Sequence, residues 1–254
     1  MSATSAIIVG ASSMLSKEIA RQLSAEGVAL ALLAHDAESI REFAEELPTP
    51  AKVYDFTIED PQILIPQLEA VWREMTDVRL ILVNTGLNSY HPELPWALEQ
   101  EIIEVDVRGF AAVCNTAFRL FQKQGVGQIA AINSIAGLRG GPSVAFHAAK
   151  AFAQNYLEGL SMHAQRLKLP ITITDIQLGL LDKAALQRSR LWLSPVDEVA
   201  RQVVDALLKG KRRVYVTKRW RLVAWLTKLL PEYIYNTRHW KKKKSKEVSS
   251  TEQH

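Results

Sequence analysis

The first 217 residues alternate between short apolar runs and amphipathic stretches. Continuous apolar runs that each end at a turn predict parallel strands buried on both faces. Such runs cover residues 6–9, 28–34, 52–56, 79–84, 128–133, 171–177 and 213–217. Between them, apolar residues recur at helical spacing, as Leu15, Ile19 and Leu23 do. Helices are predicted near residues 14–23, 38–47, 64–72, 95–121, 143–167 and 195–208.

Seven strands joined by crossover helices predict an α/β fold, a doubly wound seven-stranded parallel sheet in one domain over residues 1–217. No Pro/Gly/Ser-rich linker divides the 254-residue chain into two halves. Ligands of such sheets bind beyond the carboxyl ends of the strands. The loops expected to line this cleft follow Val9, Ala34, Asp55, Asn84, Asn133 and Gln177.

The first turn after a strand carries candidate phosphate-binding chemistry. Gly10, Ser12, Ser13, Met14 and Leu15 lie between the first strand and the first helix, where free backbone N–H groups at a helix N-terminus can hold a phosphate. A Ser-rich turn of this kind also occurs simply as a helix cap. The turn by itself therefore leaves both interpretations open.

Several turns together resemble the short-chain dehydrogenase/reductase family over about residues 5–217. The matching positions are the Gly10 turn, Asp55, Asn84-Thr85-Gly86, Ser134, Lys150 sixteen residues further on, and Gly179. The resemblance implies a Rossmann fold that binds NAD or NADP. It also implies hydride transfer to or from a carbonyl or alcohol substrate, whose identity the sequence does not give.

The family resemblance also implies a role for each matching residue. Asp55, with the adjacent Phe56, would contact the adenine. Asn84, Thr85 and Gly86 would support the strand end and the cofactor, and Gly179 would lie beside it. Ser134 would orient the substrate carbonyl, and Lys150 would hold the nicotinamide ribose. Each polar residue also has a plain structural alternative, since Asp55 can cap a turn and Lys150 can be solvated on a helix.

The choice between NAD and NADP depends on the loop after the second strand. His35 stands where NADP-dependent members of the family commonly carry an arginine that faces the 2′-phosphate. A histidine lacks the bidentate fork of arginine, and the neighbouring Asp36 would repel a phosphate. Both nucleotides therefore stay open as the cofactor.

The residues that would carry the family's chemistry depart from its pattern. Phe146 stands where the family has the tyrosine that acts as general acid/base, and a phenyl ring has no proton to give. Asp106 stands in place of an asparagine of the proton relay, and Met14 and Ser16 replace two glycines of the phosphate loop. His147, Tyr90 and His91 are weak candidates for a substitute proton donor. We therefore expect altered or lost catalysis, with a non-catalytic dinucleotide-binding or scaffolding protein as the alternative.

Basic residues are concentrated at the C-terminal end. Residues 211–254 contain 13 Lys and Arg against 3 Asp and Glu, whereas residues 1–210 contain 18 against 24. Residues 218–254 are predicted to form a basic amphipathic helix and a charged tail. The helical spacing places Leu222, Trp225, Leu226 and Leu229 on one face. A basic segment on an acidic domain indicates an anionic partner.

The sequence fits three arrangements of this tail: on a membrane, on its own domain or on a second subunit. The helix could lie on an anionic membrane, with Trp220, Trp225 and Trp240 as interfacial anchors. It could also pack on its own domain or on a second subunit, which the sequence favours over the membrane. The lysines at 241–246 come with no nucleic-acid recognition motif, so no specific nucleic acid is expected.

The remaining sequence features indicate the cellular compartment and the oligomeric state. A single cysteine, Cys114, cannot form an internal disulfide, and no apolar run is long enough to span a membrane. We therefore expect a cytoplasmic protein, peripheral at the membrane if the tail binds lipid. No metal site is predicted. The resemblance implies a homodimer or homotetramer through the helices near 95–121 and 143–167, and leaves the substrate loop at about 180–193 least transferable.

Overall fold

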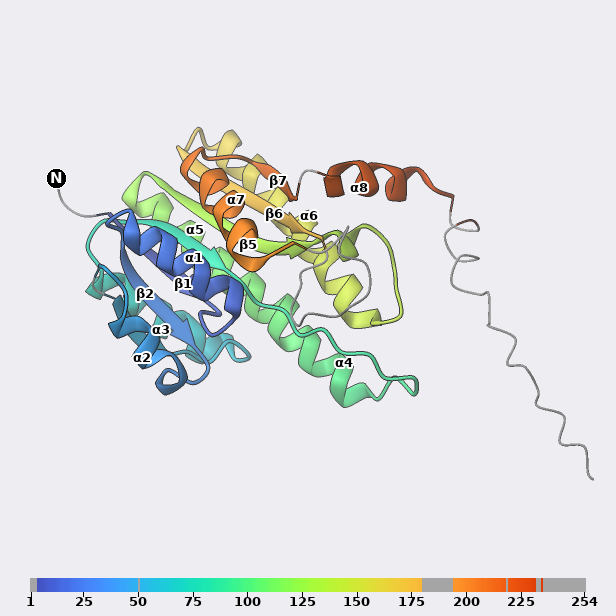
Figure 1. Cartoon of the computed structure of the whole chain (residues 1–254), viewed down its shortest axis with the longest axis horizontal. Helices are drawn as coiled ribbons and strands as arrows, with labels where there is room; N and C mark the ends of the chain where they lie inside the picture. The colour runs from blue at the N-terminus through green and yellow to red at the C-terminus, as the bar shows by residue number, and fades with distance from the viewer. Residues whose placement is uncertain (1–3, 50, 180–193, 218, 232–233, 235–254) are drawn as a thin grey trace, which may run out of the picture.

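The computed structural model describes residues 4–49, 51–179, 194–217, 219–231 and 234. Within these ranges seven parallel strands form one sheet in the order β3-β2-β1-β4-β5-β6-β7. The strands are β1 (Ser5–Val9), β2 (Ala29–Ala34), β3 (Ala51–Asp55), β4 (Val78–Val83), β5 (Gly127–Ser134), β6 (Ile171–Leu178) and β7 (Arg213–Val216). The predicted doubly wound α/β fold is confirmed (Figure 1).

Helices cover both faces of the sheet (Figure 1). The α-helices are α1 (Met14–Ala25), α2 (Arg41–Glu45), α3 (Pro61–Glu74), α4 (Trp96–Ile103), α5 (Phe110–Gln124), α6 (Val144–Arg166), α7 (Val196–Leu208) and α8 (Arg219–Leu229). Short 3-10 segments, η1 (Glu38–Ile40) and η3 (Ile135–Leu138), precede α2 and follow β5. A π-helical segment, η2 (Glu104–Gly109), joins α4 to α5.

Two apolar cores explain why the strands read as continuous hydrophobic runs. Alternate residues of each strand point to opposite faces. Ile8 joins the core formed with α1, α2 and α7, whereas its neighbour Ile7 joins the core formed with α3, α5 and α6. Both side chains are fully buried. Because both faces are covered, no polar alternation remains in the central strands.

The helix predicted over residues 95–121 is divided into α4, η2 and α5. The π-helical segment spans Glu104–Gly109 and contains Asp106, whose side chain is almost fully buried. Such segments occur mostly as single turns inside α-helices, frequently at functional sites. Hydrophobic periodicity does not detect them because the flanking helical spacing continues on both sides.

Gly10 and Gly27 form a matched pair for testing the first turn. Both have a left-handed backbone, with φ of 79° and 82°. A Cβ on Gly10 would lie 2.1 Å from the Asn84 carbonyl oxygen, whereas a Cβ on Gly27 would meet no atom within 4 Å. Gly27→Ala should therefore cost only the backbone term of about 1–2 kcal/mol. Gly10→Ala should cost about 1–3 kcal/mol more, as overpacking does. Urea unfolding of both variants measures the difference, and equal losses would contradict the steric argument.

Candidate functional site

Asn84 connects the end of β4 to the N-terminus of α1. Its backbone N–H donates to the Val9 carbonyl, at 2.9 Å. Its side-chain amide donates to the hydroxyls of Ser13 and Ser16, both at 2.8 Å. Ser13 is also the N-cap of α1 and accepts the Ser16 N–H at 3.0 Å. The family resemblance identifies Ser16 only as the replacement of a glycine. The structure shows that Ser16 is buried and is a hydrogen-bonding partner of Asn84.

The first turn of α1 presents backbone donors beside this bond network. The N–H groups of Met14 and Leu15, at the first two helical positions, have no intrahelical acceptor. The Leu15 side chain is buried in the core, so only its backbone is available to a ligand. Met14 is 55% exposed and projects from the turn, and Ser12 is also exposed. Open backbone N–H groups at a helix N-terminus are able to bind an anion, and the exposed Met14 side chain lies beside them.

Asp55, at the end of β3, is bonded to the turn after β2. Its Oδ1 accepts the Ala37 N–H at 2.8 Å. Phe56, predicted to contact the cofactor, is buried in the core, and its N–H donates to the Ala34 carbonyl at 2.8 Å. His35 and Asp36 are both exposed on this turn. The solvent-facing polar groups at this edge of the sheet therefore come from this loop and from Asp55, whereas the Phe56 side chain packs in the core.

Lys150 and Asp106 form a buried ion pair at the centre of the site. Lys150, on α6, donates from Nζ to the Thr85 carbonyl oxygen at 2.7 Å, and Nζ lies 3.8 Å from Asp106 Oδ2. The same Oδ2 accepts the Leu87 N–H at 3.1 Å. Gly86 leaves room for the ammonium group, since a Cβ there would lie 3.1 Å from Nζ. The predicted residues from β4, η2 and α6 are thus brought together.

Burial acts on both partners of this pair in opposite directions. It lowers the pKa of Lys150 below its ordinary value, and the charge of Asp106 opposes that change. Burial raises the pKa of Asp106, and the charge of Lys150 and the Leu87 N–H oppose that change. The charge of each group thus partly offsets the effect of burial on its partner. Asp106 occupies the predicted asparagine position, and in this chain it is the counter-ion of Lys150.

Phe146 lies one helical turn before Lys150 on the same face of α6. The Lys150 Nζ is 5.6 Å from the centre of the Phe146 ring, a cation–π distance. The neighbouring His147 points elsewhere: its Nδ1 lies 2.7 Å from the Ser143 carbonyl oxygen, and its ring fills the space beside Gly141. The imidazole therefore does not occupy the place of the phenol. None of the contacts described for Tyr90 or His91 joins them to Lys150.

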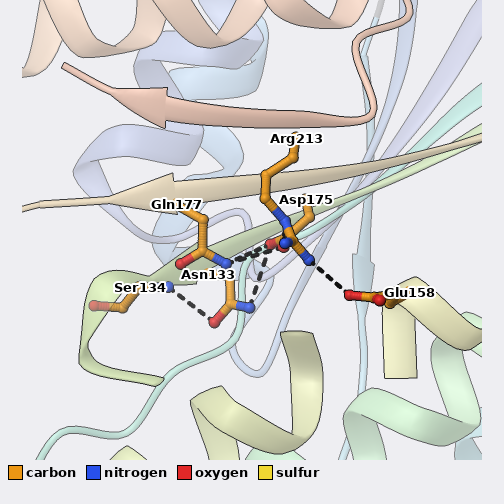
Figure 2. Close-up of polar contacts among 6 residues, drawn as sticks. All are labelled: Asn133, Ser134, Glu158, Asp175, Gln177 and Arg213. Carbon is orange, nitrogen blue, oxygen red and sulfur yellow. Dashed lines mark hydrogen bonds and ion pairs between the residues drawn. The ribbon is translucent and has the colours of Figure 1, made fainter. Parts of the chain in front are cut away.

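Ser134 ends β5 and is held by a chain of polar contacts beneath it (Figure 2). Its hydroxyl accepts the Ala136 N–H at 3.1 Å, and its own N–H donates to Asn133 Oδ1 at 2.8 Å. The Asn133 amide in turn donates to Asp175 on β6 at 3.3 Å. The Asn133 side chain therefore fixes the backbone of Ser134, and Asp175 on β6 holds the Asn133 side chain in place.

Asp175 is the hub of that chain of contacts (Figure 2). It is fully buried and accepts hydrogen bonds from Gln177 at 2.8 and 3.0 Å and from Arg213 at 3.0 Å. Arg213 also bonds Glu158 on α6, at 3.2 Å. Burial raises the pKa of Asp175, while the hydrogen bond from Gln177 and the charge of Arg213 oppose the rise. No sequence pattern predicts this cluster, because its members come from four separate elements.

Gly179, predicted to lie beside the cofactor, is in contact with α8. A Cβ at Gly179 would lie 2.1 Å from the indole nitrogen of Trp220, so the ring rests on the bare glycine. At the other end of α8, the Arg139 guanidinium donates to the carbonyls of Thr227 at 3.1 Å and Lys228 at 3.2 Å, and also to that of Leu230. The N-terminal part of the predicted tail is therefore packed on the domain.

Comparison with known proteins agrees with this geometry. The family model for short chain dehydrogenases matches residues 4–193. An uncharacterized oxidoreductase of Staphylococcus epidermidis is 24% identical over 179 residues, which cover 70% of this chain and 77% of that protein.

Two solved structures share the fold. A protein from a study of 7beta-hydroxysteroid dehydrogenase stereoselectivity has a TM-score of 0.78 at 20% identity, covering 93% of this chain and 96% of its own. A short-chain dehydrogenase from Sphingobium yanoikuyae in complex with NADPH has a TM-score of 0.73 at 15% identity, covering 95% and 98%. From the family model and the shared architecture, the chain belongs to the short-chain dehydrogenase family.

Proposed function

We propose that the protein is a divergent short-chain oxidoreductase that binds NAD(P)(H) in the cleft at the ends of β1, β4 and β5. Its hydride transfer between a carbonyl and an alcohol is weakened or lost. The observation that carries this proposal is the placement of Lys150: its ammonium bonds the Thr85 carbonyl, pairs with Asp106, and faces a phenyl ring at Phe146. Lys150 corresponds to the family's lysine by sequence spacing, and Phe146 replaces the tyrosine that would donate the proton.

The described residues fit a dinucleotide. The open N–H groups at the start of α1 suit a pyrophosphate. Gly10 adds no side chain at the end of β1, where a Cβ would lie 2.1 Å from the Asn84 carbonyl oxygen. When bound, the nicotinamide would supply or accept the hydride. Ser134 would orient the carbonyl oxygen, and Lys150 would hold the ribose hydroxyls. With Phe146 in place of tyrosine, the contribution of general acid catalysis, typically about 10²–10⁴-fold, is missing.

A non-catalytic protein that binds a dinucleotide or serves as a scaffold is the second candidate. The observation that favours it is the Trp220 indole on Gly179, because α8 then occupies the neighbourhood of the β6 strand end where the family places its cofactor. An oxidoreductase turns over a carbonyl substrate at a rate that depends on a titratable group. If one of His147, Tyr90 and His91 is the substitute proton donor of an enzyme, replacing it should abolish turnover. If the protein is a sensor or scaffold, the unmodified protein and all three variants show no turnover.

The choice between NAD and NADP as the cofactor depends on the loop after β2. His35 and Asp36 are exposed there, and the Asp36 carboxylate accepts the Ser39 N–H at 3.4 Å. The Asp36 carboxylate would repel a 2′-phosphate, whereas protonated His35 would attract it. These features keep both nucleotides as candidates, and NADPH is the ligand of one structure with the same fold.

Titration with NADPH and with NADH tests nucleotide binding directly. We expect saturable binding by nucleotide fluorescence, with a rise in melting temperature, since a ligand that binds only the native state stabilises it. Met14→Gly should tighten binding by about two- to tenfold, because ordering an exposed flexible side chain opposes binding. Met162→Gly, at an exposed methionine of α6, is the matched control. Absence of binding by either nucleotide would leave only a scaffold.

The remaining expectations about partners stay predictions. The family's chemistry implies a carbonyl or an alcohol as the substrate and nothing more specific. The predicted substrate loop at 180–193 lies outside the described residues. A homodimer or homotetramer is the family's usual assembly, and sedimentation velocity of the purified chain measures it. The cytoplasmic location rests on Cys114 and on the sequence pattern alone.

A further inference from the structure

Helix α8 packs on the domain with one face and leaves an apolar face in solvent. Trp220 and Ala224 are buried, at 7% and 1% exposure. Helical spacing puts Leu222, Trp225, Leu226 and Leu229 on the opposite side of the helix. These four are 63%, 59%, 48% and 61% exposed. We call them the outward face of α8. The predicted apolar stripe thus exists, but it is turned away from the protein.

The orientation of α8 is fixed from both ends. Trp220 rests on Gly179 at its start, and Arg139 bonds the last carbonyls at its end. Cationic guanidinium at a helix C-terminus is also electrostatically favourable. The helix lies at the outer edge of the molecule, on the side away from α2 and α3 (Figure 1). The outward face is therefore presented by a docked helix at the periphery.

Charge around the outward face selects its occupant. Arg221 and Lys228 are exposed along one border of the face, and Arg219 is on the other border. The sequence of α8 contains no acidic residue. Apolar side chains with a tryptophan, bordered by cations, match the headgroup region of an anionic bilayer, where the cations meet lipid phosphates and carboxylates.

Two other occupants fit less well. A second copy of α8 packed by two-fold symmetry would bring Arg221 and Lys228 against the same residues of its partner, with no acid in either helix to neutralise them. The chain's own residues 235–254 contain six Lys and Arg, and Tyr235, Trp240 and Val248 are their only large apolar residues. A strongly basic segment of that composition cannot cover a face already bordered by cations.

We propose that the outward face of α8 binds the surface of anionic lipid membranes and lies in the headgroup layer. Eleven residues make a helix of about 16 Å, roughly half of a hydrocarbon core of about 30 Å. The helix is therefore long enough to lie along a membrane and too short to cross it. None of the helices in the described part of the chain is long and apolar enough to cross a membrane. This inference does not depend on the nucleotide site.

Vesicle flotation of the full-length protein tests it. We expect the protein to float with vesicles of equimolar phosphatidylcholine and phosphatidylserine, and to remain behind with phosphatidylcholine alone. Trp225→Gln/Leu229→Gln should weaken partitioning at least about tenfold, because two apolar side chains no longer enter the interface. Arg221→Gln/Lys228→Gln should weaken it about fivefold for each charge removed, with a smaller dependence on salt.

Leu167→Gln/Leu208→Gln is the matched control. Both leucines are exposed, at 44% and 65%, and precede β6 and β7 at the opposite end of the sheet from α8. This variant should float as the unmodified protein does, and thermal unfolding checks that all variants are folded. Flotation of Trp225→Gln/Leu229→Gln equal to that of the unmodified protein would overturn the proposal and assign binding to the lysine-rich end. Absence of flotation would overturn it too.

Sedimentation velocity without lipid separates membrane binding from self-association. The proposal requires that Trp225→Gln/Leu229→Gln leave the oligomeric state unchanged. If the variant converts a larger assembly to a smaller one, the outward face is a subunit interface and the proposal is wrong. Nucleotide titration of the same variant distinguishes this result from failure of the proposed function, because the α8 variant should bind NADPH as the unmodified protein does.

Discussion

Phe146→Tyr should raise the rate of NADPH-dependent carbonyl reduction by about 10²–10⁴-fold, the usual contribution of a positioned general acid. The new hydroxyl would extend from a ring whose centre lies 5.6 Å from the Lys150 ammonium. A nearby cation favours the ionised phenol, so its pKa should fall below the ordinary value of about 10. Asp106 supports this effect, because its charge opposes the loss of the proton from Lys150.

Phe152→Tyr is the matched control for that experiment. Phe152 lies on the same helix but stacks against Tyr156, at 5.5 Å between ring centres. The Phe152→Tyr variant therefore adds the same hydroxyl at a place away from the ion pair of Lys150 and Asp106. Turnover of a panel of aldehydes and ketones is followed by the nucleotide absorbance, and the ultraviolet titration of the added phenol gives its pKa. The interpretation of Phe146 as the lost proton donor fails if both variants bind NADPH and neither exceeds the unmodified protein.

Asp175→Ala should lower the free energy of unfolding by about 3–5 kcal/mol, the range for removing one partner of a buried pair. The carboxylate accepts hydrogen bonds from Asn133, Gln177 and Arg213, and alanine would leave these donors without an acceptor. Each unsatisfied buried group costs about 1–3 kcal/mol. Arg213 is 26% exposed and keeps Glu158, which places the expected loss near the lower end of the range.

Glu158→Ala is the control within the same cluster. Its side chain is more than half exposed, so its bond to Arg213 should contribute no more than about 1 kcal/mol. Urea unfolding at neutral pH, with the slope unchanged, gives both losses. A loss for Asp175→Ala no larger than that for Glu158→Ala would mean that the cluster is not a stabilising core. The Asp175 variant should also loosen Ser134, whose N–H depends on the Asn133 amide that Asp175 holds.

The sheet and its cleft could be predicted from the sequence because strands buried on both faces leave a direct record. Residues such as Ile7 and Ile8 are both apolar since both faces of β1 are covered. The strand ends then locate Asn84 and Ser134 at one edge, where parallel strands place their ligands. The absence of the tyrosine at Phe146 also follows from the sequence, because the family's spacing to Lys150 is local to one helix.

Contacts between distant elements could be decided only by the tertiary structure. Ser16 meets Asn84 across 68 positions, and Asn133 meets Asp175 across 42, distances over which no local pattern records a partner. The ion pair of Asp106 and Lys150 likewise joins two separate elements, η2 and α6. Helical spacing could say that four apolar residues of α8 share a face. The tertiary contacts at the two ends of α8, Trp220 on Gly179 and Arg139 on the last carbonyls, decided that this face would point to solvent.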